Sequence, residues 1–153
     1  MKITTRVFGE MEIDDSKIIH FPAGIIGFPE MTDFALVFDE EKGKTSPIRW
    51  LQSLQETNFA LPVMDPLLVV QDYNPEVEED YLIPLGEMTA EDTLVLVTVT
   101  VPKELVKMSI NLQAPIIINA ETKKATQIIV NTEKYPVKYY IYDLLQEMKK
   151  EGE

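Results

Sequence analysis

The alternation of apolar and polar residues is strongest at residues 93–101, which read TLVLVTVTV. Val97, Val99 and Val101 lie two residues apart and are separated by threonines. Because successive side chains of a β-strand point to opposite faces, this spacing predicts a strand. The β-branched valines and threonines favour the same conformation. This segment is the clearest strand in the sequence.

Shorter strand-like patterns cover much of the remaining chain. They are residues 3–7, 11–13, 17–21, 34–38, 48–54, 59–64, 110–119 and 127–130. The polar residues 120–124 favour a turn that joins the last two strands as a hairpin, and Gly9 permits a sharp turn or bulge between the first two. Residues 39–46 are expected to form a polar loop. Pro62 has no N–H to donate, which places residues 59–64 at a sheet edge or a bulge.

A helical pattern is clear only at the C-terminus. Its apolar residues follow the spacing i, i+3, i+4 and i+7 on one helix face, at Ile141, Leu144, Leu145 and Met148. Lys149 and Lys150 favour the negative end of the helix dipole. The apolar stripe either packs on the protein core, which is the more frequent outcome, or forms a docking surface for another chain. Residues 89–92 fit a short helical turn with Thr89 as its N-cap.

Short strands with frequent proline and glycine, and little helix between them, are typical of an antiparallel β architecture. The chain has 153 residues, 45% of them hydrophobic, which is enough for one domain with a sizeable core. No linker, repeat or low-complexity segment divides it. We therefore predict a mainly β fold: a single-domain, antiparallel, β-barrel-like structure over residues 1–153 with a C-terminal helix.

Negative charge is concentrated in the middle of the chain. Between Trp50 and Pro102 there is no Lys, Arg or His, whereas ten residues carry a carboxylate: Glu56, Asp65, Asp72, Glu76, Glu78, Glu79, Asp80, Glu87, Glu91 and Asp92. The net charge of the whole chain is −12, so this window supplies most of it. Such a surface attracts basic partners and argues against direct nucleic-acid binding, which needs clustered Lys and Arg. A solvated face kept for solubility is the alternative that charge alone leaves open.

Residues suited to catalysis or metal binding are sparse. The chain has no cysteine and a single histidine, His20, in an apolar string where a histidine is more often structural than catalytic. No phosphate-binding glycine motif is present, and the acidic residues 76–80 lack the alternating ligands and turn glycine of a calcium loop. A paired-carboxylate glycosidase has thin support because aromatic residues are few, so we expect no enzyme, cofactor or metal. The absence of cysteine, of a signal-like start and of a membrane-length apolar run predicts a cytoplasmic protein without membrane segments.

Several segments with an unusual order of residues resemble the FliW family of flagellar assembly factors. They are residues 21–28 running on to Phe34, residues 50–53, residues 65–73 and residues 111–119. In the first segment, Pro22 fixes φ, Gly24 and Gly27 allow turns, and aromatic residues at both ends can pin the loop to the core. These motifs are structural rather than chemical, and they follow the order of the family over nearly the whole chain.

The resemblance implies a binding protein. Proteins similar to FliW bind CsrA, a small dimeric RNA-binding repressor of translation, and relieve its repression of flagellin messenger RNA without competing for its RNA-contacting surface. They also bind flagellin, which sequesters them until its secretion frees them. The alternative is a flagellin-specific cytoplasmic chaperone that acts mainly on export or folding. We expect a monomer, because the protein must expose a charged face to a dimeric partner.

The resemblance assigns no contact residue, so the candidate partner-binding residues come from expected exposure. Proline and dense acids predict a surface loop that contains Asp72, Tyr73, Glu76, Glu78, Glu79 and Asp80. Tyr73 is the expected aromatic anchor, because binding hot spots are enriched in tyrosine, and the carboxylates would steer a basic partner. Alternatively, Tyr73 packs into the barrel and the acids only face water. Docked beside an RNA-binding surface, the acids would repel RNA phosphates within a screening length of about 8 Å, without overlap.

Overall fold

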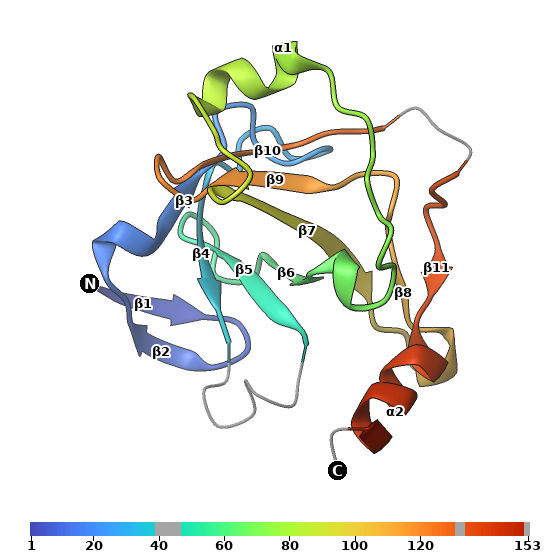
Figure 1. The fold of residues 1–153 in the computed structure, drawn as a ribbon. Helices are drawn as coiled ribbons and strands as arrows, with labels where there is room; N and C mark the ends of the chain where they lie inside the picture. Colours follow the sequence, from blue (N-terminus) through green and yellow to red (C-terminus); the bar gives the residue numbers. More distant parts are fainter. Residues whose placement is uncertain (39–46, 131–133, 152–153) are drawn as a thin grey trace.

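The computed structural model describes residues 1–38, 47–130 and 134–151 (Figure 1). Its strands are β1 (Lys2–Thr5), β2 (Gly9–Glu12), β3 (Ile18–His20), β4 (Asp33–Val37), β5 (Arg49–Ser53), β6 (Ala60–Met64), β7 (Thr93–Thr100), β8 (Ser109–Ile110), β9 (Ile116–Asn119), β10 (Lys124–Gln127) and β11 (Tyr139–Tyr140). Its α-helices are α1 (Glu79–Leu82) and α2 (Tyr142–Glu151). Short 3-10 helices lie at Asp15–Lys17, Pro66–Leu68, Ile83–Leu85 and Leu105–Lys107. The loop expected at residues 39–46 lies outside the described residues.

Seven strands close into a barrel (Figure 1). Strands β3 to β7 pair in sequence order, β9 pairs with β7, and β10 pairs with both β9 and β3. All these pairs are antiparallel except β3 with β10, which are parallel and meet at His20 and Lys124. Because these two strands are far apart in the sequence, no tight hairpin dictates their relative direction. The predicted mainly β, barrel-like fold with a C-terminal helix is confirmed, with one parallel pair that the pattern did not predict.

Strand β7 pairs with three neighbours, which confirms the prediction for residues 93–101 to within one residue. Thr93–Leu96 pair with β9, the next two residues pair with β6, and the last two pair with β8. The single strand expected at residues 110–119 is interrupted between β8 and β9. There the side chain of Asn111 accepts the N–H of Gln113 at 3.0 Å in a turn, and Pro115 has no N–H for a ladder.

Pro62 lies neither at a sheet edge nor at a bulge in the ladder with β5, so the expectation for residues 59–64 is wrong. Strand β6 runs between β5 and β7, and Pro62 faces Trp50 of β5. The N–H of Ser53 donates to the carbonyl of Phe59 at 2.9 Å. Hydrogen-bonded and non-hydrogen-bonded pairs alternate along an antiparallel ladder, so Trp50 and Pro62, three positions further along, form a non-hydrogen-bonded pair. The nitrogen of Pro62 therefore points away from β5. On its other side, the ladder with β7 begins only at Val63. An inner strand tolerates the proline because no donor is needed at that position.

The β9–β10 hairpin forms as predicted, but its second strand lies earlier in the chain. Strand β10 ends at Gln127, where the predicted strand over residues 127–130 begins. Beyond it, two N–H groups still donate to the segment before β9: Ile128 to the carbonyl of Pro115 (3.1 Å) and Val130 to that of Gln113 (2.8 Å). Residues 128–130 are therefore an irregular extension of the hairpin.

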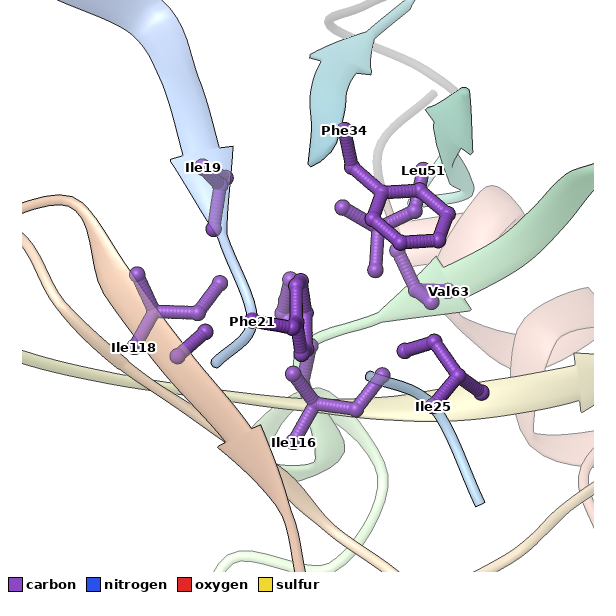
Figure 2. Close-up of a cluster of buried hydrophobic side chains, with 10 residues drawn as sticks. Ile19, Phe21, Ile25, Phe34, Leu51, Val63, Ile116 and Ile118 are labelled. Atoms are coloured by element: carbon purple, nitrogen blue, oxygen red, sulfur yellow. The ribbon is translucent and has the colours of Figure 1, made fainter. Parts of the chain in front are cut away.

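Apolar side chains from most of the strands fill the barrel interior (Figure 2). The labelled residues of this cluster are Ile19, Phe21, Ile25, Phe34, Leu51, Val63, Ile116 and Ile118. Phe21 and Phe34 are fully buried, and their rings meet edge to face with centroids 5.2 Å apart. Burying a side chain of this size stabilises the fold by roughly 1.5–3 kcal/mol. Phe21 therefore pins the start of the loop at residues 21–28 to the core, as predicted.

The C-terminal helix α2 packs on a second buried cluster. Ile141, which directly precedes the helix, is fully buried, and Leu145 packs against the same cluster. For these residues, core packing is confirmed as the role of the apolar stripe. The side chains of Met148, Lys149 and Lys150 lie outside the described part of the structure. No helix of the described residues is long and apolar enough to cross a membrane.

The short turn expected at residues 89–92 forms, whereas one helical segment was not expected. The N–H of Asp92 donates to the carbonyl of Thr89 at 3.1 Å and lies 3.3 Å from its hydroxyl oxygen, so Thr89 caps this turn as predicted, although the turn does not continue into a helix. The hydroxyl of Thr89 also donates to the carboxylate of Asp92 at 3.0 Å. Helix α1 and the 3-10 helix Ile83–Leu85 were not predicted, because segments this short carry no measurable periodicity.

Candidate partner-binding surface

The five carboxylates predicted for partner binding lie on the surface, within one stretch of nine residues. Asp72, Glu76, Glu78, Glu79 and Asp80 are all exposed, and we call residues 72–80 the acidic segment. The chain enters this segment after β6 and the 3-10 helix Pro66–Leu68, and continues into α1 (Figure 1). Two of the acids lie in the first turn of α1, where negative charge is favoured by the helix dipole.

Tyr73 is buried, so its expected exposure is wrong. Only 7% of the residue is exposed, and its hydroxyl donates to the carbonyl of Leu112 at 2.7 Å. Its ring meets that of Tyr135 edge to face with centroids 4.7 Å apart, and the Tyr135 hydroxyl accepts the N–H of Asn74 at 3.0 Å. Burial raises the pKa of the Tyr73 hydroxyl, and the neighbouring Tyr135 contributes in the same direction. Tyr73 thus anchors the acidic segment to the barrel, which is the alternative that the sequence left open.

The other end of this region is fixed as well. Leu85 is fully buried, and its carbonyl accepts hydrogen bonds from the side chains of Asn119 (2.8 Å) and Thr122 (2.9 Å) in the β9–β10 hairpin. Between the two anchors, Val77 packs against the cluster that contains Leu85. Because three inward side chains hold the backbone, the carboxylates face water from a preorganised segment.

None of the five carboxylates forms an ion pair within the described residues, where the ion pairs involve the N-terminus, His20 and Lys107. The window from Trp50 to Pro102 itself contains no Lys, Arg or His. An unpaired set of exposed charges produces a field that extends over the screening length of the solvent, about 8 Å at physiological salt. This surface is therefore suited to attract a basic protein surface.

The loop at residues 21–31 is held by backbone and side-chain hydrogen bonds. Ile25 and Phe28 exchange two backbone hydrogen bonds of 3.2 and 2.7 Å, and the N–H of Ile26 donates to the side chain of Gln127 at 3.1 Å. Gly24 has φ of +71°, and a Cβ at this position would lie 2.4 Å from the carbonyl oxygen of Pro29. Glycine is therefore required at this position, whereas the sequence pattern predicted only that it allows a turn. The loop leaves the side chains of Ile26 and Phe28 about half exposed.

Two grooves meet at Ile129, whose side chain is 61% exposed. The first, which we call the apolar groove, has a volume of about 470 Å³. Its apolar lining residues include Ile26, Phe28, Ile129 and Val137. The second, which we call the acidic groove, has a similar volume and is lined by Glu76, Val77, Glu78, Tyr81, Ile128, Ile129 and Val130.

These grooves were not predicted from the sequence, although one signal was present. In the run Ile128–Val130, an extended chain that buries the first and third side chains must expose the second. The structure buries Ile128 and Val130 and exposes Ile129. The apolar composition of the run masked this alternation.

His20 lies on the surface of the barrel. Its Nδ1 lies 2.8 Å from a carboxylate oxygen of Asp33, and both side chains are partly exposed. The two residues face each other across the β3–β4 ladder, so the contact joins these strands. In the described part of the chain, no group of three or more His, Cys, Asp or Glu residues could hold a metal ion.

Comparisons with known proteins agree with the resemblance seen in the sequence. A family model described as FliW protein matches residues 2–141. A flagellar assembly factor FliW from Lachnoclostridium phytofermentans is 41% identical over 155 residues, which cover 100% of this chain and 99% of the relative. One from Lachnospira eligens is 44% identical over 147 residues, which cover 95% and 97% of the two chains.

A solved structure gives the same result at the level of the fold. The crystal structure of a flagellar assembly factor FliW matches with a TM-score of 0.83 at 28% identity, covering 92% of this chain and 96% of that one. The family model and the two relatives extend over nearly the entire sequence, including the barrel, the loop at residues 21–31 and the acidic segment. The chain belongs to the FliW family.

Proposed function

We propose that this chain acts in flagellar assembly by binding a CsrA-type RNA-binding repressor of translation. Binding would antagonise the attachment of the repressor to flagellin messenger RNA without occupying its RNA-contacting surface. Flagellin would in turn sequester the chain, so that the two partners alternate. Family membership supports the role in flagellar assembly, and the resemblance described above implies the two partners.

The observation that carries this proposal is the anchored acidic segment. Its five exposed carboxylates are unpaired, and Tyr73 and Leu85 hold the backbone that presents them. A basic repressor surface is attracted to such a field during encounter. Once docked, the same charges would lie within reach of RNA phosphates, whose contacts dominate RNA affinity and depend strongly on electrostatics.

The test is displacement of flagellin leader RNA from the repressor by wild-type protein and by the triple variant Glu78→Lys, Glu79→Lys, Asp80→Lys. The variant should displace RNA less effectively, and its association with the repressor should be slower and less dependent on salt. Because exposed charges contribute only about 0–1 kcal/mol per pair to stability, its circular dichroism and melting should stay close to wild type.

A matched control reverses three exposed carboxylates outside the window: Glu10→Lys, Glu30→Lys and Glu121→Lys. It changes the net charge by the same amount, so it separates the local field from the total charge. The control should displace RNA almost as well as wild type. Equal displacement by all three proteins at every ionic strength would show that the acidic segment serves solubility only.

A flagellin-specific chaperone acting on export or folding is the second candidate, and the apolar groove is the observation that favours it. A chaperone needs exposed apolar surface for its client, and Ile26, Phe28 and Val137 provide such surface. Binding measurements with the repressor, with flagellin and with both together distinguish the candidates. A chaperone binds flagellin and leaves the repressor–RNA complex intact. Sedimentation of the protein alone tests the expected monomer.

A further inference from the structure

Residues 127–130 present an unpaired backbone edge on the outside of the barrel. The N–H groups of Ile128 and Val130 donate to the chain segment that precedes β9. Alternate residues of an extended chain direct their backbone groups to opposite sides, so Ile129 directs its N–H and C=O outward. Neither of these two groups has a hydrogen-bond partner among the described residues. Since the side chain of Ile129 is also largely exposed, water now solvates this edge.

The two faces of this edge border grooves of different chemistry. Gln127 and Ile129 line the apolar groove, and none of the described residues around that groove is charged. Ile128 and Val130 line the acidic groove together with Glu76 and Glu78 of the acidic segment. In Figure 1 the chain that leads into α1 runs past the end of β10, which agrees with this arrangement.

We propose that Ile129 binds an extended segment of a basic partner protein by strand addition. The backbone of the segment would exchange hydrogen bonds with the N–H and C=O of Ile129. Its aliphatic side chains would enter the apolar groove, and its Lys or Arg side chains would lie beside Glu76 and Glu78. Since successive side chains of a strand point to opposite faces, the recognised pattern is an alternation of aliphatic and basic residues.

Charge selects this occupant over a second copy of the chain. This protein has 26 acidic and 14 basic residues, so another copy would bring mainly negative charge to an acidic groove. A helix is also a poor occupant, because its backbone groups are bonded internally and leave the donor and acceptor of Ile129 unused. An extended basic segment satisfies the backbone edge and both grooves together.

This inference goes beyond the proposed function, because it concerns the conformation and chemistry of a bound segment and not the identity of the partner. The RNA-displacement assay reports on the acidic segment with the whole repressor present. A titration with a peptide reports on the edge at Ile129 and its two grooves, with no repressor or RNA present. Either experiment can therefore fail while the other succeeds.

The test is an NMR titration of isotope-labelled protein with a short capped peptide in which lysine alternates with valine. We expect saturable shifts centred on residues 127–130 and slower exchange of the Ile129 amide proton. A peptide with glutamate in place of lysine should bind at least about tenfold more weakly, which tests the acidic groove. Two further peptides are N-methylated, one on every lysine and one on every valine. Because alternate residues direct their N–H groups to opposite sides, one of these two peptides cannot donate to Ile129 and should lose affinity by a similar factor, whereas the other should not.

Two matched variants locate the site on the protein. Ile129→Asp should weaken binding of the lysine–valine peptide by at least about tenfold, because it places a charge in the apolar groove. Val106→Asp is the control, since Val106 is also 61% exposed and lines neither groove. Both variants should keep the wild-type melting temperature. The inference is overturned if the peptide causes no shifts, if the shifts centre elsewhere, if both N-methylated peptides bind as well as the unmethylated one, or if Ile129→Asp binds like the control.

Discussion

Replacing Tyr73 with phenylalanine removes a single hydroxyl from the anchor of the acidic segment. Phenylalanine preserves the ring contact with Tyr135 but leaves the carbonyl of Leu112 without its 2.7 Å donor. Leaving a buried polar group unsatisfied costs about 1–3 kcal/mol, so Tyr73→Phe should lower the free energy of unfolding by that amount. For a chain of this length, each kcal/mol corresponds to a fall in melting temperature of about 2–4 °C.

The same variant should also remove a dependence of stability on pH. Burial raises the pKa of the Tyr73 hydroxyl above its ordinary value of 10.0. Above that pH the unfolded chain loses the proton while the folded chain retains it, so the folded state binds more protons and stability falls as pH rises. The contribution of the Tyr73 hydroxyl to the free energy of unfolding is fully present below about pH 10. It declines above that pH, with a slope of up to about 1.4 kcal/mol per pH unit.

The measurement is urea unfolding of wild type and Tyr73→Phe at neutral pH and at several values between about pH 9 and pH 11. The other tyrosines are common to both proteins, so the difference between the two curves isolates Tyr73. Tyr140→Phe is the control, because Tyr140 is 59% exposed, and it should match wild type within about 0.5 kcal/mol. If Tyr73→Phe matches wild type at neutral pH and follows the same curve at high pH, then Tyr73 does not anchor the acidic segment.

Three further outcomes are expected. Gly24→Ala should destabilise the protein by more than about 2 kcal/mol, because the added Cβ collides with Pro29. Gly27→Ala should cost only the backbone strain of about 1–2 kcal/mol, because its Cβ meets no atom within 4 Å. Equal melting temperatures of the two variants would refute the collision. The protein alone should show no affinity for RNA at moderate salt, because its net charge of −12 repels phosphates, and filter binding checks this. Calorimetry with a CsrA-type repressor should give sub-micromolar affinity, corresponding to roughly 8 kcal/mol or more, and the absence of both heat and co-elution would remove the proposed function.

Most of the barrel strands were predictable because their signals are local. The alternation at residues 93–101 and the apolar run before Pro22 both correspond to strands within a residue or two. Pro62 shows where local reasoning fails: its missing donor is harmless because the β6–β7 ladder begins at the next residue. That register is a relation between two strands about 30 residues apart, and no pattern within either strand contains it.

The sequence by itself determined the fold class, the family and the exposure of the carboxylates. Charged side chains stay in water almost regardless of their neighbours, because burying an unpaired charge costs too much free energy. Only the tertiary structure decided the role of Tyr73, whose hydroxyl finds its acceptor 39 residues away at Leu112. It also decided that Ile129 lies exposed between two grooves, since both grooves are built from segments distant in the chain. An aromatic or aliphatic side chain is stable in either setting, so its position depends on which partners the fold brings to it.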